Sequence, residues 1–403
     1  MSAHPEAATP APALEPPRSP LDVLRRVVRG DVTSVRVVLA IVVIWLIFQL
    51  ENDRFLSAVN LTNLVLQITA TGLISVGVVY VLLLGEIDLS VGAVSGVTSA
   101  LMAVLNVQHG WNPYLAIAAA VVMGIGIGVL QGALFSSFGV PSFVVTLAGL
   151  LTWQGLQLYI LGDTGSVNVT NGKIVGLANH FYSDAAGWVF GAVVIVAYAG
   201  TALWSLRARR AAGLADTEAA GPIARIVIVA AATIAVVAVL NSDRGVPLAV
   251  LILVAFVAGM QYVATRTLFG RHVFAVGGNA EAARRAGIRI NRIRIIVFGI
   301  SGAMAAIGGV LAASRLLSVD QSAGGSDLLL FAIAGPVIAG TSLFGGRGSV
   351  WSALLGAITI GSISNGMDLL ALQSSVKFMV TGGVLVAAVI VDALARRSRQ
   401  ARA

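Results

Sequence analysis

Apolar stretches of roughly 20 residues recur along almost the whole of this 403-residue chain, and each is long enough to span a bilayer as a helix. Hydrophobic residues make up 57% of the chain and charged residues 11%, against about 25% charged in soluble domains. This composition excludes an ordinary soluble protein, a disordered chain and a nucleic-acid-binding module. The sequence therefore predicts an all-α polytopic membrane protein. The twelve expected spans are 35–50, 61–84, 91–107, 114–137, 142–161, 187–205, 226–241, 246–264, 294–314, 328–345, 350–367 and 376–393.

The basic residues predict how these spans are oriented, because Arg and Lys accumulate in cytoplasmic loops. If the N-terminus is cytoplasmic and the spans alternate, most basic residues fall on the cytoplasmic side. The exceptions among the 26 are Arg54, Lys173, Arg244, Arg315 and Lys377. The opposite orientation would invert this distribution. Both termini are therefore predicted to lie in the cytoplasm.

The two ends of the chain differ from its apolar middle. Residues 1–34 are rich in Pro and Ala, which predicts a disordered cytoplasmic tail. Residues 35–393 form the expected transmembrane domain, and 394–403 a cytoplasmic C-terminal tail. The chain has no Cys, and its four His residues are scattered, so we expect neither a disulfide nor a metal site.

Gly124, Gly128 and Gly132 are spaced four residues apart within one expected span. Small residues at this spacing allow two membrane helices to approach closely. The stripe therefore indicates close packing within the chain or, alternatively, a face for a second copy. Internal packing is favoured because a bundle of this size needs many close helix crossings.

A polar segment in the long loop before residue 294 predicts a helix of about two turns. Asn279 suits an N-cap, and Glu281 in the first turn suits the helix dipole. Arg284 and Arg285 fall in the last turn, and Gly287 can end the helix. So short a helix needs a docking surface. Its small residues are compatible with packing on its own bundle or with insertion into a soluble partner.

The same loop reads AVGGNAEAARRAGI (275–288) and closely resembles the coupling loop of bacterial ABC sugar-importer permeases of the ribose, xylose and galactoside type. Two other segments resemble signatures of that family, GEIDLSVGAVSG (85–96) and GTSLFGGRGSV (340–350). The resemblance covers roughly 55–395. Glu86 and an extra hairpin at about 187–241 resemble the xylose branch.

The resemblance implies a permease subunit that moves a monosaccharide, such as the pentose D-xylose, across the inner membrane of a prokaryote. It implies a second permease copy, most simply a homodimer, a cytoplasmic ABC ATPase that binds ATP-Mg, and an extracytoplasmic sugar-binding protein. This chain would contact membrane lipid, bind no cofactor or nucleic acid, and have no catalytic residue. Residues 265–293 would be the cytoplasmic coupling loop, and its contacts to the ATPase would be Asn279, Glu281, Ala282, Arg284, Arg285 and Gly287.

An ATPase site of its own is not expected in this chain. A phosphate-binding loop requires G-x-x-x-x-G-K-[ST]. The single Gly-Lys pair, Gly172-Lys173, is followed by Ile174. The chain is therefore predicted to be a transport subunit rather than an enzyme.

The first signature places Glu86 and Asp88 beside membrane-quality sequence, followed by Ser90. Ionisable groups within a bilayer are costly and usually functional. The pair is compatible with a solvated turn in which Asp88 caps the next helix, or with a pore site for sugar hydroxyls or a proton. The turn is favoured because a new apolar run starts directly after Ser90.

The second signature predicts a tight turn at Gly345, Gly346 and Arg347, since Gly allows backbone conformations that other residues avoid. A gate near the pore axis, or a further contact to the ATPase, is the alternative.

Polar residues within the spans are candidates for the sugar pathway, because sugars need hydrogen-bond partners and stack on aromatic faces. Such residues include Thr69, Ser75, Thr152 and Gln157, and the five pathway candidates chosen from the whole set are Gln67, Thr71, Trp153, Gln154 and Asn365. Each is equally compatible with a hydrogen bond to a neighbouring helix.

Two other classes of function compete with the importer. A secondary transporter driven by an ion gradient would use Glu86 and Asp88 as a proton site. A membrane-embedded enzyme lacks support, because neither H-E-x-x-H nor a Ser/His/Asp set occurs in the spans.

Overall fold

The computed structural model describes residues 32–213 and 220–400, and these are predominantly helical. The predicted tail therefore lies, except for its last residues, outside the described residues. Eleven of the twelve apolar segments predicted as spans coincide with helices, and the segment 328–345 does so only in its first part. The helices are α2 (Val32–Glu51), α3 (Ala58–Leu83), α4 (Val91–Ala103) with its π-helical continuation η1 (Val104–Gln108), α5 (Pro113–Phe138), α6 (Ser142–Leu161), α7 (Gly172–Asn179), α8 (Asp184–Ala211), α9 (Ala220–Asn241), α10 (Leu248–Arg266), α11 (Leu268–Gly278), α12 (Ala280–Arg285), α13 (Ile290–Leu316), α14 (Ser326–Ile338), α15 (Trp351–Leu369) and α16 (Ser374–Gln400).

Eight of the described helical segments are long and apolar enough to cross a membrane. They are α3, α4 with η1, α5, α6, α8, α9, α10 and α13. Helix α14 is also apolar but has 13 residues, which gives a length of about 20 Å. That is less than the roughly 30 Å of a hydrocarbon core. The predicted span 328–345 is therefore a short helix followed by an irregular segment, and not one continuous helix.

The chain divides into two compact units. One contains most of the hairpin formed by α8 and α9, residues 190–235. The other contains 33–189 and 236–403 and carries all the features described below.

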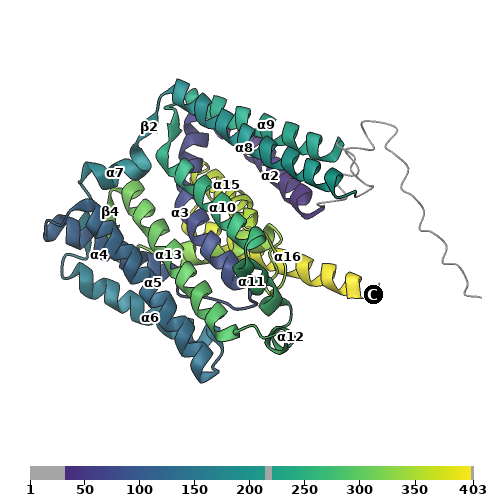
Figure 1. The fold of residues 1–403 in the computed structure, drawn as a ribbon. Helices are drawn as coiled ribbons and strands as arrows, with labels where there is room; N and C mark the ends of the chain where they lie inside the picture. Colours follow the sequence, from purple (N-terminus) through teal and green to yellow (C-terminus); the bar gives the residue numbers. More distant parts are fainter. Residues whose placement is uncertain (1–31, 214–219, 401–403) are drawn as a thin grey trace, which may run out of the picture. The chain divides into compact units, whose positions relative to one another are not determined.

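Helix α3 is the centre of the larger unit. It packs against α10, α13, α14 and α15 (Figure 1). In its most apolar window 83% of the residues are buried, against 22% for α6. Its side chains therefore meet other helices on nearly every side, whereas much of α6 presents apolar side chains outward.

The glycine stripe of α5 packs within the chain. A Cβ on Gly124 would lie 2.4 Å from the carbonyl oxygen of Gly302, and one on Gly128 would lie 2.0 Å from that of Phe298. A Cβ on Gly132 would be 2.9 Å from the Cα of Ile295. All three neighbours belong to α13. Internal packing, the favoured reading of this stripe, is confirmed.

Two short antiparallel sheets join loops that are far apart in sequence. Strands β1 (Ser166–Asn168) and β4 (Ser318–Asp320) pair with Ser166 opposite Asp320. Strands β2 (Phe181–Tyr182) and β3 (Val246–Pro247) pair with Phe181 opposite Pro247. The second sheet holds together the two chain segments that flank α8 and α9 in sequence.

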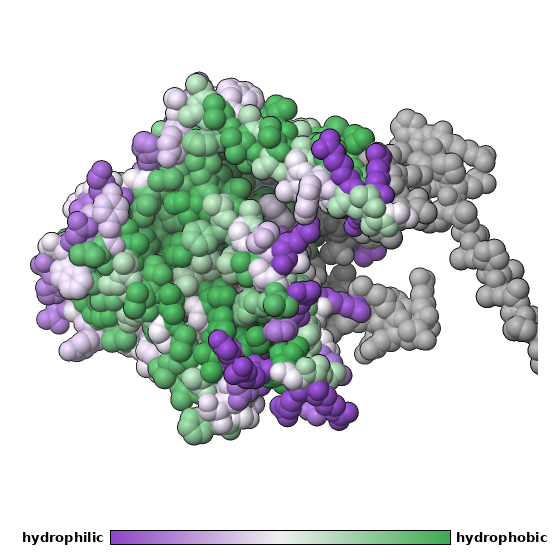
Figure 2. All heavy atoms as spheres, in the orientation of Figure 1, coloured by the Kyte–Doolittle hydropathy of each residue, from purple (hydrophilic) through white to green (hydrophobic). Residues whose placement is uncertain are grey.

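The visible surface separates by polarity. Figure 2 shows hydrophobic side chains over much of that face, and hydrophilic side chains gathered around α12. Exposed apolar residues of α5 and α6, such as Val122, Phe143 and Leu151, are what a lipid-facing surface requires.

Candidate functional site

Helix α12 forms where the sequence predicts it, with both ends capped. The side chain of Asn279 accepts a hydrogen bond of 2.9 Å from the backbone N–H of Ala282. At the other end Gly287 has a φ of +83°, and the N–H of Ile288 donates to the carbonyl oxygen of Ala283 at 3.0 Å. These bonds satisfy terminal groups that a helix of six residues leaves open.

The two faces of α12 differ. Ala283 is buried and Ile288 is partly buried against the core of the bundle. Ala282 and Ala286 are exposed. These two alanines therefore do not pack on the bundle, although their small apolar side chains are compatible with such packing. Glu281 pairs with Arg284 at 3.6 Å and with Arg285 at 3.5 Å, and all three side chains are at least 60% exposed. The helix therefore packs on its own bundle by one edge and leaves a charged face free.

Helix α11, which the sequence reading missed, connects α12 to the interior. Gly277 lies so close to the end of α3 that a Cβ there would be 1.8 Å from the carbonyl oxygen of Leu83. The same carbonyl accepts a hydrogen bond of 2.9 Å from the N–H of Gly346. A Cβ on Gly345 would in turn be 2.6 Å from the carbonyl oxygen of Gly277. The loop 275–288 and the two signatures, 85–96 and 340–350, therefore come together through backbone contacts.

We call this meeting point the glycine junction and define it by Leu83, Gly85, Gly277, Gly345 and Gly346. Gly85, Gly345 and Gly346 have φ values of +76°, +80° and +69°, which favour glycine. Asn279 alone separates α11 from α12. Only Gly278 and Asn279 lie between Gly277 and α12, so a displacement of α12 acts close to a contact with no free space, and tightly packed interiors transmit strain.

Glu86, directly after the junction, forms an ion pair with Arg294 of α13 at 2.7 Å. Their side chains are 15% and 28% exposed. The guanidinium of Arg294 also lies 5.4 Å from the ring centroid of Phe135. The sequence assigned Arg294 only as a cytoplasmic charge, because nothing in its spacing connects it to a residue 208 positions away. The pair ties the first signature to α13.

Asp88 lies in the turn between α3 and α4, as predicted, but it is buried and not solvated. It is 5% exposed. Its Oδ1 accepts hydrogen bonds from the N–H of Ser90 at 2.9 Å and the hydroxyl of Ser90 at 2.7 Å, and its Oδ2 from the hydroxyl of Ser301 at 3.1 Å. The expectation that it caps the next helix is also wrong, since α4 has Ser90 at its N-cap without a side-chain bond. Burial raises the pKa of Asp88, while the Ser90 and Ser301 hydrogen bonds lower it.

Helices α5 and α6 complete the support of this turn. The backbone N–H groups of Ile87 and Leu89 donate to the hydroxyls of Ser142 at 3.3 Å and Thr146 at 3.1 Å. The hydroxyl of Ser90 also lies 3.0 Å from the Oε1 of buried Gln131. Sequence reasoning missed these partners, because a Ser, Thr or Gln in an apolar helix gives no sign of which neighbour it meets.

The second signature folds as the predicted tight turn. The N–H of Ser342 donates to the carbonyl oxygen of Arg347 at 3.0 Å, and the side chain of Arg347 is exposed. Gln261 of α10 accepts from the N–H of Val350 at 2.8 Å and from the hydroxyl of Ser349 at 3.1 Å. The turn is therefore held from both sides, by Gln261 and by the glycine junction.

The five pathway candidates lie on three helices. Asn365 of α15 exchanges hydrogen bonds with Asn60 at 2.8 Å and 3.1 Å, so its side chain joins two helices. Trp153 and Gln154 are partly buried on α6. Gln67 and Thr71 of α3 are partly exposed. Of the five, only Asn365 has a side-chain hydrogen bond to another described residue.

Comparison with known proteins identifies the family. The family described as "Branched-chain amino acid transport system / permease component" matches residues 60–389. This chain belongs to that permease family. The xylose transport system permease protein XylH of Escherichia coli K12 is 37% identical over 359 residues, which is 89% of this chain and 91% of the relative. No solved structure matches the chain.

Other relatives extend the match within the family. XylH of Haemophilus influenzae is 34% identical over 88% of this chain and 94% of its own length. The ribose import permease protein RbsC of Escherichia coli K12 is 29% identical over 88% of this chain and 92% of its own length. The expected resemblance to ABC permeases of the xylose and ribose type is thus confirmed. Bacterial relatives and multiple apolar helices together support a multi-pass inner-membrane protein of a prokaryote.

Proposed function

We propose that this permease is the membrane-spanning subunit of an ATP-driven importer for a monosaccharide, with xylose as the sugar. The printed names of the relatives, xylose transport permease and ribose import permease, support a sugar of this class. Two copies of the chain form the pore, and a soluble extracytoplasmic protein delivers the sugar. The nucleotide is hydrolysed elsewhere, because this sequence has no phosphate-binding loop.

The observation that carries the proposal is the position of α12. It is exposed and charged on one face, and two residues, Gly278 and Asn279, connect it to Gly277 of the glycine junction. A cytoplasmic ABC ATPase that changes shape on binding ATP needs an exposed surface of this kind on the permease, which it can bind and displace. This binding surface consists of Asn279, Glu281, Ala282, Arg284 and Arg285, and Gly287 ends the helix that carries it.

A movement of α12 can be transmitted to two parts of the bundle. Through Gly277 it bears on the end of α3, and through the hydrogen bond from Gly346 to Leu83 it bears on the turn after α14. Helix α3 is the most buried candidate span in the bundle. A small displacement of α12 would therefore move the end of α3, at the centre of the bundle, as well as surface residues.

The basis for the orientation is the distribution of basic residues, most of which fall in the tails and loops predicted to be cytoplasmic, including the loop that contains α12. Both termini are then cytoplasmic, with α2 leading away from the cytoplasm and α3 leading back toward it. Helix α3 has 26 residues, about 39 Å of length, so its first residues lie at the extracytoplasmic end. Sugar would enter beside residues 58–63 and leave toward the glycine junction.

The experiment is gentle detergent purification of the tagged chain from its native membrane, followed by mass spectrometry of the proteins that co-elute. We expect a stoichiometric soluble ATPase that carries a phosphate-binding loop, and an extracytoplasmic binding protein whose ligand is a pentose. A chain that elutes alone, and that takes up sugar in ATP-free vesicles when a proton gradient is applied, would overturn the proposal.

A further inference from the structure

The extracytoplasmic end of α3 carries a polar stripe that the account of coupling does not use. From Leu64 to Leu83, every residue of α3 is buried except Val65, Gln67 and Thr71. Gln67 and Thr71 continue a row that begins at the exposed Asn63, with spacing of four residues. Residues four apart lie on one face of a helix. Accessible polar groups therefore run along one side of the most buried candidate span.

Thr71 differs from the other threonines of this helix. The hydroxyls of Thr62 and Thr69 donate to the carbonyl oxygens of Ala58 at 2.9 Å and Val65 at 2.8 Å. Within the described residues neither Thr71 nor Gln67 has a side-chain hydrogen bond. Polar groups without partners would be costly against lipid. A water-filled path satisfies them, and so does a solute rich in hydroxyl groups.

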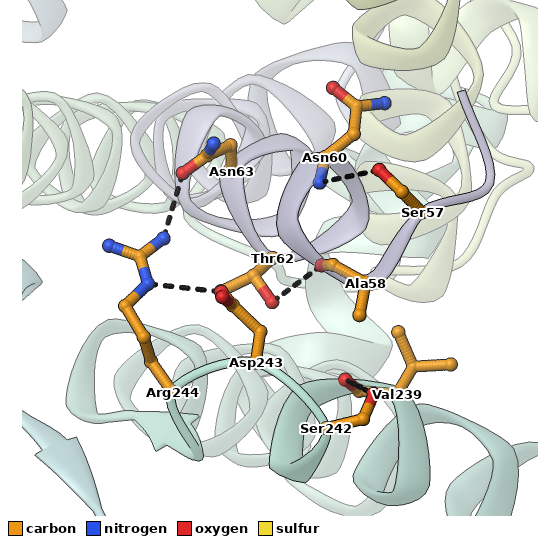
Figure 3. A network of polar contacts seen from close by, with 9 residues as sticks. All are labelled: Ser57, Ala58, Asn60, Thr62, Asn63, Val239, Ser242, Asp243 and Arg244. Carbon is orange, nitrogen blue, oxygen red and sulfur yellow. Dashed lines mark hydrogen bonds and ion pairs between the residues drawn. The ribbon is translucent and has the colours of Figure 1, made fainter. Parts of the chain in front are cut away.

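Arg244 covers the first member of the row. Its guanidinium Nη2 donates to the Oδ1 of Asn63 at 2.8 Å, and its Nε donates to the Oδ2 of Asp243 at 3.0 Å. Figure 3 shows Arg244 reaching from the segment after α9 across to the first turns of α3. The guanidinium also lies 4.5 Å from the centre of the Phe181 ring. Arg244 thus joins two segments that are 181 residues apart in sequence.

The contact can open readily. The side chain of Arg244 is 43% exposed, and ion pairs that reach solvent hold their partners weakly. In the described part of the chain a single hydrogen bond links Arg244 to α3, whereas Asp243 and the Phe181 ring keep the guanidinium on its own side. Loss of that one bond frees the carboxamide of Asn63 without unfolding either segment.

We propose that Asn63, Gln67 and Thr71 form a hydrogen-bonding path for a polyhydroxylated solute, and that Arg244 closes the extracytoplasmic mouth of this path through Asn63. The proposal rests on the importer function in one respect, namely that the solute is a sugar. Whether the path is aqueous and gated is independent of the energy source.

Single-cysteine labelling tests this directly, because the chain has no Cys of its own. Gln67→Cys and Thr71→Cys are exposed in turn to a membrane-impermeant methanethiosulfonate reagent in intact cells, without added sugar. Thr69→Cys is the matched control, since Thr69 lies on the same helix and is 1% exposed. We expect labelling at positions 67 and 71, none at 69, and slower labelling in the presence of xylose. Equal labelling at the three positions, or labelling that xylose does not slow, would overturn the path.

The gate is tested by adding Arg244→Gln to each reporter variant. We expect labelling at 67 and 71 to quicken roughly threefold, since a contact that reaches solvent favours the closed state by only a small margin. Asn63→Ala removes the acceptor from the other side, leaves the Asp243 pair intact and should have the same effect. An unchanged rate in both variants would overturn the gate. ATP-dependent uptake by the unmodified chain is measured separately, so failure of the importer function would be distinguishable from failure of this path.

Discussion

The backbone N–H of Gly346 donates a hydrogen bond of 2.9 Å to the carbonyl oxygen of Leu83, the last residue of α3. This bond joins two segments that are more than 250 residues apart. Gly277 closes on the same carbonyl from a third segment. The end of α11, the turn after α3 and the turn after α14 are therefore in direct backbone contact.

Gly277→Ala should disrupt this contact, while Gly278→Ala should not. A Cβ at 277 would lie 1.8 Å from the carbonyl oxygen of Leu83, whereas one at 278 would have nothing within 4 Å. Neither glycine has a positive φ, so steric overlap alone separates them. We expect Gly277→Ala to cost about 1–3 kcal/mol of stability, as overpacking does, and to lower sugar uptake.

The measurement is thermal unfolding in detergent together with uptake in vesicles. Equal behaviour of the two alanine variants would contradict the close approach at Gly277.

Removal of either partner of the Glu86–Arg294 pair should destabilise the bundle. The pair is 2.7 Å long and largely shielded, so Glu86→Gln should cost about 1–3 kcal/mol. The exposed Glu281–Arg285 pair is the control, because an i,i+4 pair in solvent contributes about 0.3–0.5 kcal/mol. A double-mutant cycle read by chemical denaturation measures both. A coupling energy no larger at Glu86–Arg294 than at Glu281–Arg285 would refute this assignment.

Asp88→Asn should be tolerated and Asp88→Ala should not. Asparagine keeps an oxygen for Ser90 and can donate to Ser301, while alanine leaves the Ser90 N–H without its acceptor. We expect Asp88→Ala to cost about 1–3 kcal/mol. Uptake by Asp88→Asn then tests the alternative in which this carboxylate carries a proton. Abolished uptake by a well-folded Asp88→Asn protein would favour that alternative.

A bulky charge on the free face of α12 should detach the ATPase. Ala282 is exposed there, and Ala282→Glu keeps the helix and its cap at Asn279. We expect the ATPase to be lost from the purified complex. Arg54→Glu, an equally exposed site before α3 at the other end of the bundle, is the control. Retention of the ATPase by Ala282→Glu would show that α12 is not its binding site.

Local features of this chain could be predicted from its sequence. The length of the apolar stretches predicts where most of the long helices lie. The order Asn279, Glu281, Arg285, Gly287 marks the ends of α12, because each residue acts on its own helix terminus. Gly345 and Gly346 predict a turn for the same local reason. What these predictions share is that the deciding interaction lies within a few residues.

Most of the missed features are contacts between distant segments. Asp88 is expected to be solvated, yet it is buried and accepts a hydrogen bond from Ser301 of α13. Arg294 looks like a loop charge, but Glu86 neutralises it. Gly277 is unremarkable until Leu83 is placed against it. Helix α14 is a local exception: it ends at Ile338, where Gly340 has a φ of +99° and the N–H of Thr341 donates to the carbonyl oxygen of Pro336 at 2.9 Å.

The most direct test of the central claim is the energy source of transport in proteoliposomes that contain this chain, its ATPase and the sugar-binding protein. ATP-driven import predicts that xylose accumulates when ATP is supplied, that it does not when ATP is withheld, and that a protonophore has no effect. Accumulation that needs no ATP and collapses with the proton gradient would contradict it.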